Sequence, residues 1–372
     1  MCLISVVIPV FNTSRFLGWL LESISKTRGL DLEFIFVDDA SGDDSAAILR
    51  HFLAENSWLN AQLLVHQRNG GLSLARRSGY QQASGEYVWF LDSDDHFDVE
   101  SLRKIYEIVL ARRFDAIIFE HRECRIEAGV MTYLNVVQRQ HAAKHSATDG
   151  QGAMIACLRD RNVYAWGLIA RKSAFQQNFF PPGKLFEDIP TIPVVLAACH
   201  SVKYASYAVV NYLLRSDSIM HNVTLKSCID LMGAGQRLRL RATRFEGGLD
   251  RKTLEEVELY RVLCLLWAAR RAYAGGQWEE AKFQRMLRLH LPNLNGKIEF
   301  LYHIRIVKLL IKRQRWREAV SYIMLQNPHS YRCLRNYLAS IKAYPASSGS
   351  TTYRPSPLSL ERWMEPLLRG AR

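Results

Sequence analysis

The stretch Ile4-Ser5-Val6-Val7-Ile8-Pro9-Val10-Phe11 (ISVVIPVF) decides how the fold begins. It is short, apolar and rich in β-branched residues, as expected of a strand that is buried on both faces. Similar apolar runs follow it, separated by amphipathic stretches of helical length. The further expected strands are Leu32–Val37, Ala61–His66, Tyr87–Leu91 and Ala116–Glu120, and the expected helices are Phe16–Lys26, Ser45–Glu55, Leu72–Ala83 and Val99–Arg112. This alternation predicts an α/β fold with a doubly wound, Rossmann-like sheet.

Acidic residues follow two of the expected strands directly. Asp38 and Asp39 come after the second strand, and the run Asp92-Ser93-Asp94-Asp95 comes after the fourth. Ligands of such sheets bind outside the carboxyl ends of the strands. Carboxylates this close repel one another unless a cation neutralises them, and Mn²⁺ or Mg²⁺ prefers carboxylates together with substrate phosphates. An acidic turn that caps the next helix is the alternative, but the position at a strand end favours a metal site.

Three further features suit a nucleotide site, each with a structural alternative. One of Asp38 and Asp39 can accept a hydrogen bond from a nucleobase N–H; helix capping is the alternative for the segment from Ser41 to Asp44, but it does not explain two acids directly at a strand end. Gly70-Gly71 lets the backbone approach a ligand, and Arg76 one turn into the next helix can pair with a diphosphate; a solvent-facing basic helix explains that segment equally well. Glu187-Asp188 either caps a helix or supplies a general base, and sequence alone leaves both open.

Composition limits the classes of partner. The 372 residues are 48% hydrophobic and 23% charged, as in folded globular proteins, and the net charge of +13 favours an anionic partner such as nucleotide phosphates, nucleic acid or an acidic membrane surface. The seven cysteines are scattered and form no C-x-x-C pair, so we expect reduced thiols in a cytoplasmic protein rather than a zinc or disulfide framework. No secretion signal and no apolar stretch long enough to span a bilayer are apparent.

The pattern changes along the chain. Residues 1–222 contain the strand–helix alternation and, from Cys124 onward, a more irregular part with several glycines and prolines. Residues 223–343 have long helical runs and are expected to form a helical C-terminal subdomain. Residues 344–372 read as a flexible tail with a short amphipathic helix. A basic amphipathic stretch at 305–317 suits an anionic membrane surface at the inner face of the cell membrane, or is an ordinary helix with its charged face in water.

Taken together, these segments resemble the family 2 glycosyltransferases with a GT-A fold, of the bacterial surface-polysaccharide type. The resemblance runs from Ser5 to about Asn222, and the order and spacing of its motifs are specific even though each motif is weak alone. The matching segments are Val7-Ile8-Pro9-Val10-Phe11-Asn12, Val37-Asp38-Asp39-Ala40-Ser41, Asn69-x-Gly71-x-Ser73-x-Ala75-Arg76, Ala83-x-Gly85-Glu86-Tyr87, Phe90-Leu91-Asp92-Ser93-Asp94-Asp95, Glu187-Asp188 and Tyr212-x-x-Arg215-x-x-Ser218.

The resemblance implies a metal-dependent, inverting glycosyltransferase that moves a sugar from a nucleotide-diphosphate sugar, with UDP expected, to a hydroxyl of a glycan or lipid-linked acceptor in capsule, lipopolysaccharide or other surface-glycan synthesis. It also implies a role for each matched residue. The base would be held by Pro9, Phe11 and Asp39 with Asp38 beside it, and the base or diphosphate by Arg76. Asp92-Ser93-Asp94 would be the D-x-D element, with Asp92 toward the ribose and Asp94 on the metal. Arg215 would lie near the pyrophosphate, Asp188 would be the catalytic base, and Trp166 and Glu187 would line the sugar or acceptor pocket.

Two other classes of protein remain as alternatives. A sugar nucleotidyltransferase uses a related sheet, but a Gly-rich basic phosphate loop would be expected after the first strand, where Pro9-Val10-Phe11-Asn12-Thr13 stands. A non-enzymatic nucleic-acid or membrane binder would suit the positive charge. We expect no nucleic-acid partner, because acids gathered at strand ends would repel phosphates.

Overall fold

The computed structural model describes residues 2–111, 113–144, 147–175, 179–215, 223–278 and 280–290, with eight further residues between 306 and 322. The chain divides into two compact units, Met1–Tyr322 and Ile323–Arg372, and all that follows concerns the first. The predicted tail at 344–372 and most of the predicted basic stretch at 305–317 lie outside the described residues. Residues 216–222, which directly precede the predicted domain boundary between 222 and 223, also lie outside the described residues.

The first unit is built on a mixed β-sheet with the strand order β3-β2-β1-β4-β9-β6-β10-β5, with β7 paired to β6 and β8 to β10. The strands are β1 (Ile4–Val10), β2 (Leu32–Asp38), β3 (Ala61–Val65), β4 (Tyr87–Phe90), β5 (His96–Phe97), β6 (Ala116–Glu127), β7 (Val130–Val137), β8 (Ala147–Thr148), β9 (Leu168–Arg171) and β10 (Val202–Leu213). Strands β3, β2, β1 and β4 are parallel, whereas β9 runs antiparallel to both β4 and β6. The predicted α/β sheet is therefore confirmed.

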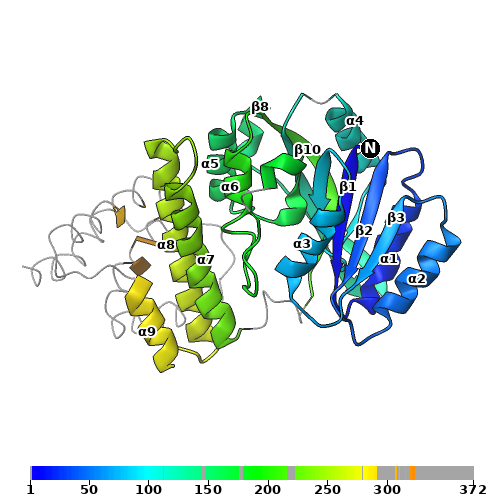
Figure 1. The fold of residues 1–372 in the computed structure, drawn as a ribbon. Coiled ribbons are helices and arrows are strands. Elements are labelled where there is room, and N and C mark those ends of the chain that lie inside the picture. Colours follow the sequence, from blue (N-terminus) through cyan, green and yellow to red (C-terminus); the bar gives the residue numbers. More distant parts are fainter. Residues whose placement is uncertain are drawn as a thin grey trace, which may run out of the picture. The chain divides into compact units, whose positions relative to one another are not determined.

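Helices cover this sheet and continue beyond it (Figure 1). They are α1 (Ser14–Ser25), α2 (Ser45–Glu55), α3 (Leu72–Gln82), α4 (Val99–Leu110), α5 (Gly150–Asp160), α6 (Ile192–Ala197), α7 (Leu225–Thr243), α8 (Arg251–Ala274) and α9 (Ala281–His290). Each of the first four begins and ends within a few residues of the helix expected from the sequence. Their crossover connections return the chain to the same edge of the sheet, so that β1, β2, β3 and β4 end together there.

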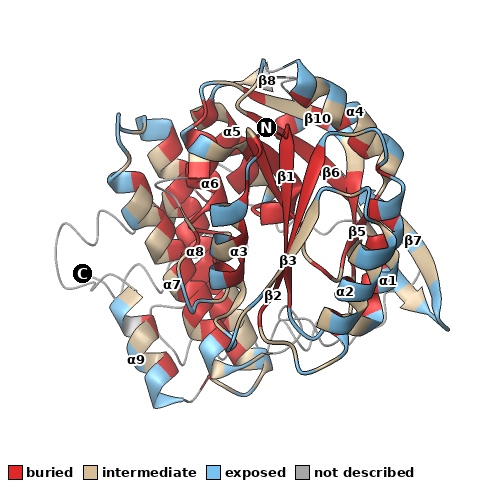
Figure 2. Cartoon of the chain, turned by 45° about the vertical axis from the view of Figure 1, so that its right-hand side comes forward, coloured by how far each residue is buried: buried red, intermediate tan, exposed pale blue. Residues whose placement is uncertain are grey.

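The core lies on the two faces of the central strands (Figure 2). All residues of β1, β2 and β4 are buried. The expectation that Ala61–His66 is buried in the same way is wrong: β3 ends at Val65, its residues are only half-buried, and Val65 is exposed. The reason is its place at the end of the strand order, where only β2 flanks it.

The irregular part from Cys124 to Asn222 contains more regular structure than the sequence indicates. It holds α5 and α6 and the strands β7, β9 and β10, and β10 pairs in parallel with β6 along most of its length. The register of this pair shifts between Ala205 and Ala208 and again between Ala208 and Val210. Bulges of this kind break the period-two alternation by which a strand is recognised, which explains why β10 was not expected.

The helices predicted for the C-terminal region are present in its described part, between residues 223 and 290, and α7 and α8 lie side by side as a pair (Figure 1). The side chain of Thr224 caps α7 in a reciprocal capping box, and the Asp250 carboxylate caps α8 by accepting from the Thr253 N–H. Gly235 allows the close approach, because a Cβ atom placed there would meet the Cβ of Cys264 at 2.9 Å. None of the described helices combines the length and the apolar character needed to cross a bilayer.

Candidate active site

Hydrogen bonds join the loops after β1, β2 and β4. The Asn12 N–H donates to Ser41 Oγ over 3.0 Å, and the Gly42 N–H donates to Asn12 Oδ1 over 2.8 Å. The hydroxyls of Thr13 and Ser93 are hydrogen-bonded at 3.0 Å. The D-x-D segment is thereby fixed against the first loop, so the sheet brings three of the predicted site segments into one place.

Asp39 binds the backbone of the chain itself. Its carboxylate accepts hydrogen bonds from the Gly70 N–H at 2.9 and 3.1 Å and from the Gly71 N–H at 2.7 Å, and it lies 2.6 Å from His66 Nδ1. The other ring nitrogen of His66 lies 2.9 Å from Ser78 Oγ. A carboxylate has about four acceptor positions, and these contacts use them. Asp39 thus holds the glycine turn at the start of α3, and its predicted contact with a base remains a prediction.

Asp38 is buried as deeply as Asp39, but its carboxylate makes fewer hydrogen bonds. One oxygen, Oδ2, accepts from the Ser41 N–H at 3.3 Å, while Oδ1 is buried and has no hydrogen-bond partner among the described residues. A buried acceptor without a partner costs free energy, which a ligand N–H would recover. Of the two acids, Asp38 therefore has the oxygen whose hydrogen-bonding capacity the described residues leave unused. Nearby, Pro9 is buried and Phe11 is 47% exposed.

Arg76 connects two groups of predicted residues. Its guanidinium is only 1% exposed and lies over the ring of Phe180 at 4.8 Å. One nitrogen, Nη2, donates to Asp92 over 2.9 Å; the other, Nη1, donates to Glu187 over 2.7 Å and to Asp188 over 2.9 Å. Burial alone would lower the pKa of Arg76, but the three carboxylates raise it above its ordinary value. The arginine therefore stays charged, and a single guanidinium fixes the D-x-D acid and the predicted base relative to each other.

The backbone around Asp188 is held in an uncommon conformation. Phe186, two residues earlier, has a φ of 58°, a value that non-glycine residues rarely adopt. The Ala165 N–H donates to Asp188 Oδ2 over 3.1 Å, opposite the oxygen that accepts from Arg76. Burial raises the pKa of the Asp188 carboxyl to about 7, against the charge of Arg76 and with the help of Glu187 and Asp92. A carboxyl with a pKa near neutrality suits proton transfer.

The acids of the D-x-D segment form one cluster. Oxygens of Asp92, Asp94 and Asp95 all lie within 4.8 Å of one another. Burial raises the pKa of Asp94, with the charge of Asp92 adding to the effect and that of Arg215 opposing it, and burial together with both neighbours raises the pKa of Asp95 well above its usual range. Asp95 Oδ1 accepts from the Leu213 N–H at 2.8 Å, while its buried Oδ2 has no hydrogen-bond partner among the described residues.

This cluster fits a divalent cation. The donor set consists only of oxygens and carries excess negative charge, as Mg²⁺ and Mn²⁺ require. Arg215 already contacts it, with Nη2 2.7 Å from Asp94 Oδ2. A side chain predicted to lie near the pyrophosphate thus lies next to the residue predicted to hold the metal.

Trp166 belongs to an aromatic stack close to Asp188, the predicted catalytic base. Its ring is buried, stacked on Tyr164 at 4.6 Å and on Tyr212 at 5.6 Å, with His121 edge-on at 4.8 Å. The residue before it, Ala165, donates the hydrogen bond to Asp188. The stack therefore supports the backbone that orients the Asp188 carboxylate, and the predicted contact of Trp166 with a sugar or acceptor remains a prediction.

Three side chains at the site were not expected from the sequence. His66 contacts Asp39, Thr13 contacts Ser93, and Phe180 packs against Arg76. His66 and Thr13 each follow a strand end by one to three residues, which is a usable signal. Phe180 carries no such signal, because its approach to Arg76 depends on a loop whose path only the tertiary structure reveals.

Comparison of the sequence and the structure with known proteins shows which proteins this chain resembles. Residues 5–163 match the model of the family described as Glycosyl transferase family 2. The solved structure of Staphylococcus aureus TarS residues 1–349, in complex with UDP-GlcNAc, is similar over 92% of this chain and 93% of that one, with a TM-score of 0.65 and 18% identity. At this identity the likeness shows the fold, which is the predicted GT-A fold.

Among curated proteins, two glycosyltransferases of Streptococcus pneumoniae are similar in sequence. GlyA is 27% identical over 58% of this chain and GlyG is 27% identical over 59% of it. The match covers 31% of the length of GlyA and 73% of that of GlyG. The matched part of this chain thus spans less than a third of the length of GlyA.

Proposed function

We propose that this protein is an inverting glycosyltransferase that moves a sugar from a nucleotide-diphosphate sugar to an acceptor hydroxyl. The observation that carries the proposal is the Arg76 guanidinium, which holds Asp92 of the D-x-D element and Asp188 within hydrogen-bonding distance at once. A transferase needs its donor-side acid and its base at a fixed separation, because the two reacting groups must meet in one geometry. An acidic surface patch would not need a buried arginine to bridge two distant segments.

The donor nucleotide would bind at the carboxyl ends of β1, β2 and β4. Asp38 Oδ1 is the acceptor proposed for a base N–H, and the exposed ring of Phe11 is the proposed surface for the base to stack on. The UDP-GlcNAc complex of TarS, which shares the fold, supports a UDP-linked donor. Arg215 lies beside Asp94 and would pair with the diphosphate.

A divalent cation fits the same place, and Asp94 is proposed to hold it with Asp92 and Asp95 adjacent. When bound, Mn²⁺ or Mg²⁺ would neutralise the charge that gathers on the departing nucleoside diphosphate. The protein's own part is to hold these two acids in place, Asp92 through an ion pair with Arg76 and Asp94 through one with Arg215.

Asp188 is proposed as the base that takes the proton from the acceptor hydroxyl. Its Oδ1 is bound to Arg76 and its Oδ2 to the Ala165 N–H, so the carboxylate is held in one orientation. Attack from the face opposite the leaving group then inverts the anomeric carbon. General-base assistance contributes roughly 10²–10⁴-fold to such a step. Glu187 shares Arg76 with Asp188, and its charge helps keep the pKa of Asp188 high.

The acceptor is proposed to be a glycan or lipid-linked sugar of a surface polymer, made at the cytoplasmic face of the membrane. The net charge of +13 supports an anionic surface nearby. Co-sedimentation with anionic liposomes at low salt tests this part alone: binding supports it, and no binding excludes the membrane contact without touching the transfer reaction.

The proposed function is tested by incubating the protein with nucleotide sugars, Mn²⁺ and a glycan acceptor and analysing the products. Transfer releases UDP, whereas a nucleotidyltransferase releases pyrophosphate or consumes it. We expect UDP from a UDP-sugar with wild type and about 10²–10⁴-fold less with Asp188→Asn, which keeps the size of the side chain and removes the base. Matched nucleotide binding in both proteins would show that the site is intact. Equal turnover in the variant would remove Asp188 from the base role, and pyrophosphate exchange would replace the proposal.

A further inference from the structure

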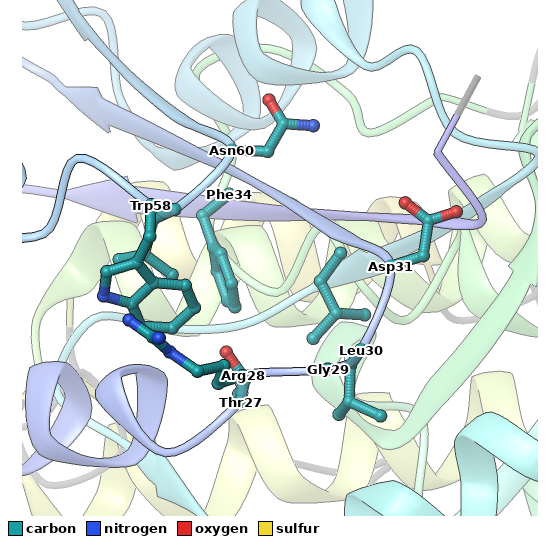
Figure 3. A pocket seen from close by; sticks show the side chains of 10 residues that line it. Thr27, Arg28, Gly29, Leu30, Asp31, Phe34, Trp58 and Asn60 are labelled. Atoms are coloured by element: carbon teal, nitrogen blue, oxygen red, sulfur yellow. The ribbon is translucent and has the colours of Figure 1, made fainter.

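A pocket of about 360 Å³ lies beside the amino ends of β2 and β3 (Figure 3). One wall is the connection from α1 to β2, which contains Arg28 and Asp31. The other is the end of the connection from α2 to β3, which contains Trp58 and Asn60. Both connections lead into the amino ends of strands, whereas the active-site loops follow their carboxyl ends. The two sites are therefore separated by the length of the strands.

The pocket combines one exposed aromatic ring with an apolar floor and a polar rim. Trp58 is 38% exposed, whereas Phe34 beneath it is 1% exposed. In Figure 3 the two aromatic side chains lie next to each other, with Asp31 on the far side and Asn60 above. Among the described residues, neither the Asp31 carboxylate nor the Asn60 amide is hydrogen-bonded to another protein group. Their hydrogen-bonding capacity is available to a ligand.

The walls are fixed before any ligand binds. Arg103 of α4 donates to the carbonyls of Lys26 and Arg28 over 3.1 and 3.3 Å, and the Asp31 N–H donates to the Tyr106 hydroxyl over 3.3 Å. Gly29, at a φ of 90°, makes the turn between them. Across the pocket, the Phe34 N–H donates to the Asn60 carbonyl over 2.9 Å. A preformed site loses less conformational entropy on binding than a flexible one.

The charges favour a neutral ligand. The Arg28 guanidinium lies over the Trp58 ring at 4.8 Å, and the Asp31 carboxylate faces the same pocket. Their opposite charges offset each other, so the pocket favours neither an anion nor a cation. A flat aromatic ligand would bind most tightly stacked between two exposed rings, but of the two aromatic side chains in this pocket Trp58 is exposed and Phe34 is buried. A neutral molecule with one apolar face and several hydroxyl groups fits all of these features.

A pyranose ring is such a molecule. Its axial C–H groups form an apolar face that would pack on the part of the Trp58 ring that Arg28 leaves exposed. Its hydroxyls would donate and accept around the edge, where Asp31 accepts, Arg28 donates and Asn60 does both. The volume is at the small end of the range for ligand pockets, about 300–1,000 Å³. We propose that this pocket binds a sugar ring of a glycan, as a carbohydrate site separate from the site of transfer.

The test is binding of the labelled full-length protein to a printed glycan array, in the absence of nucleotide sugar and metal. We expect wild type to bind a subset of glycans, and the Trp58→Ala variant to bind the same glycans about tenfold or more weakly, because the platform is lost. Trp58→Phe, which keeps an aromatic ring, should retain most of the binding. Leu110→Ala removes an exposed apolar side chain from α4, outside the pocket lining, and should bind as wild type does.

Three results would overturn the inference: no glycan bound by wild type, equal binding by Trp58→Ala, or loss of binding in Leu110→Ala as well. Unchanged thermal melting of each variant shows that the fold is intact, which is expected because both side chains are exposed. The readout involves no transfer reaction, so failure of the proposed function would leave this result standing, and the reverse also holds.

Discussion

At the scale of single residues, the pKa of Asp188 gives the proposed mechanism a pH dependence. A general base acts only when it is deprotonated, and burial raises the pKa of this carboxyl to about 7. The fraction in the active form therefore rises with pH and levels off above neutrality; at pH 5 it is roughly a hundredth. We expect kcat, measured at saturating donor and metal, to increase from pH 5.5 to 8. A flat profile over that range would contradict the assignment of Asp188.

The neighbouring acids Asp38 and Asp39 are expected to behave in opposite ways. Asp39→Asn removes charge from a carboxylate that accepts from Gly70 and Gly71, and should lower the free energy of unfolding by about 1–3 kcal/mol. Asp38→Asn should change stability little and weaken UDP binding, because Oδ1 of Asp38 has no hydrogen-bond partner in the described part of the chain. Urea unfolding and titration calorimetry on both variants separate the two effects. Stronger loss of UDP affinity in Asp39→Asn would restore the assignment made from sequence.

At the scale of elements, the start of α3 depends on a glycine. Gly71 has a φ of 84° and a ψ of 164°, a region almost restricted to glycine, and its N–H binds Asp39. We expect Gly71→Ala to destabilise the protein by about 1–3 kcal/mol in urea unfolding. Gly18→Ala is the matched control: this glycine lies within α1, a Cβ there meets nothing within 4 Å, and the change should stabilise by roughly 0.5–1 kcal/mol. Equal effects of both changes would mean that backbone strain at Gly71 is unimportant.

The pairing of α7 with α8 makes a second comparison between two glycines. A Cβ at Gly235 would lie 2.9 Å from Cys264 Cβ and 3.1 Å from Arg261 Cα, whereas one at Gly233 would meet only the end of the flexible Arg237 side chain. We expect Gly235→Ala to lower the free energy of unfolding by about 1–3 kcal/mol, because the added Cβ overpacks the contact between the helices. Gly233→Ala should leave the free energy of unfolding unchanged or raise it. Thermal unfolding of the two variants distinguishes them. A stabilised Gly235→Ala would show that the helices are not packed this closely.

At the scale of the whole molecule, the sequence predicted those helices and strands that are recognisable from the spacing of apolar residues within the element itself. The strands β1, β2 and β4 are buried runs of β-branched and aromatic residues, and α1 to α4 have clear amphipathic spacing, so their alternation was sufficient. Strand β10 escaped prediction because bulges interrupt its period. The half-buried state of β3 could not be foreseen either, since it depends on which strand stands at the end of the order.

The candidate site was predictable in composition and less so in its contacts. Strand ends indicated Asp38, Asp39 and the acids of the D-x-D segment, because parallel strands place their carboxyl ends together. The sequence could not indicate that Arg76 binds Asp92 and Asp188, which stand 16 and 112 residues away from it. Nor could it reveal that both oxygens of Asp39 accept from backbone N–H groups, whereas Oδ1 of Asp38 has no hydrogen-bond partner among the described residues. Such partners are set by tertiary packing, which residue spacing does not encode.

The central claim is that the acids at these strand ends form one site for a nucleotide diphosphate and a divalent cation. Titration calorimetry of UDP with and without Mn²⁺, on wild type and Asp94→Asn, tests it most directly. We predict that wild type binds UDP at least about tenfold more tightly with Mn²⁺ than without it, and that Asp94→Asn loses this difference. UDP affinity that is the same with and without Mn²⁺ in wild type, or no UDP binding at all, would contradict it.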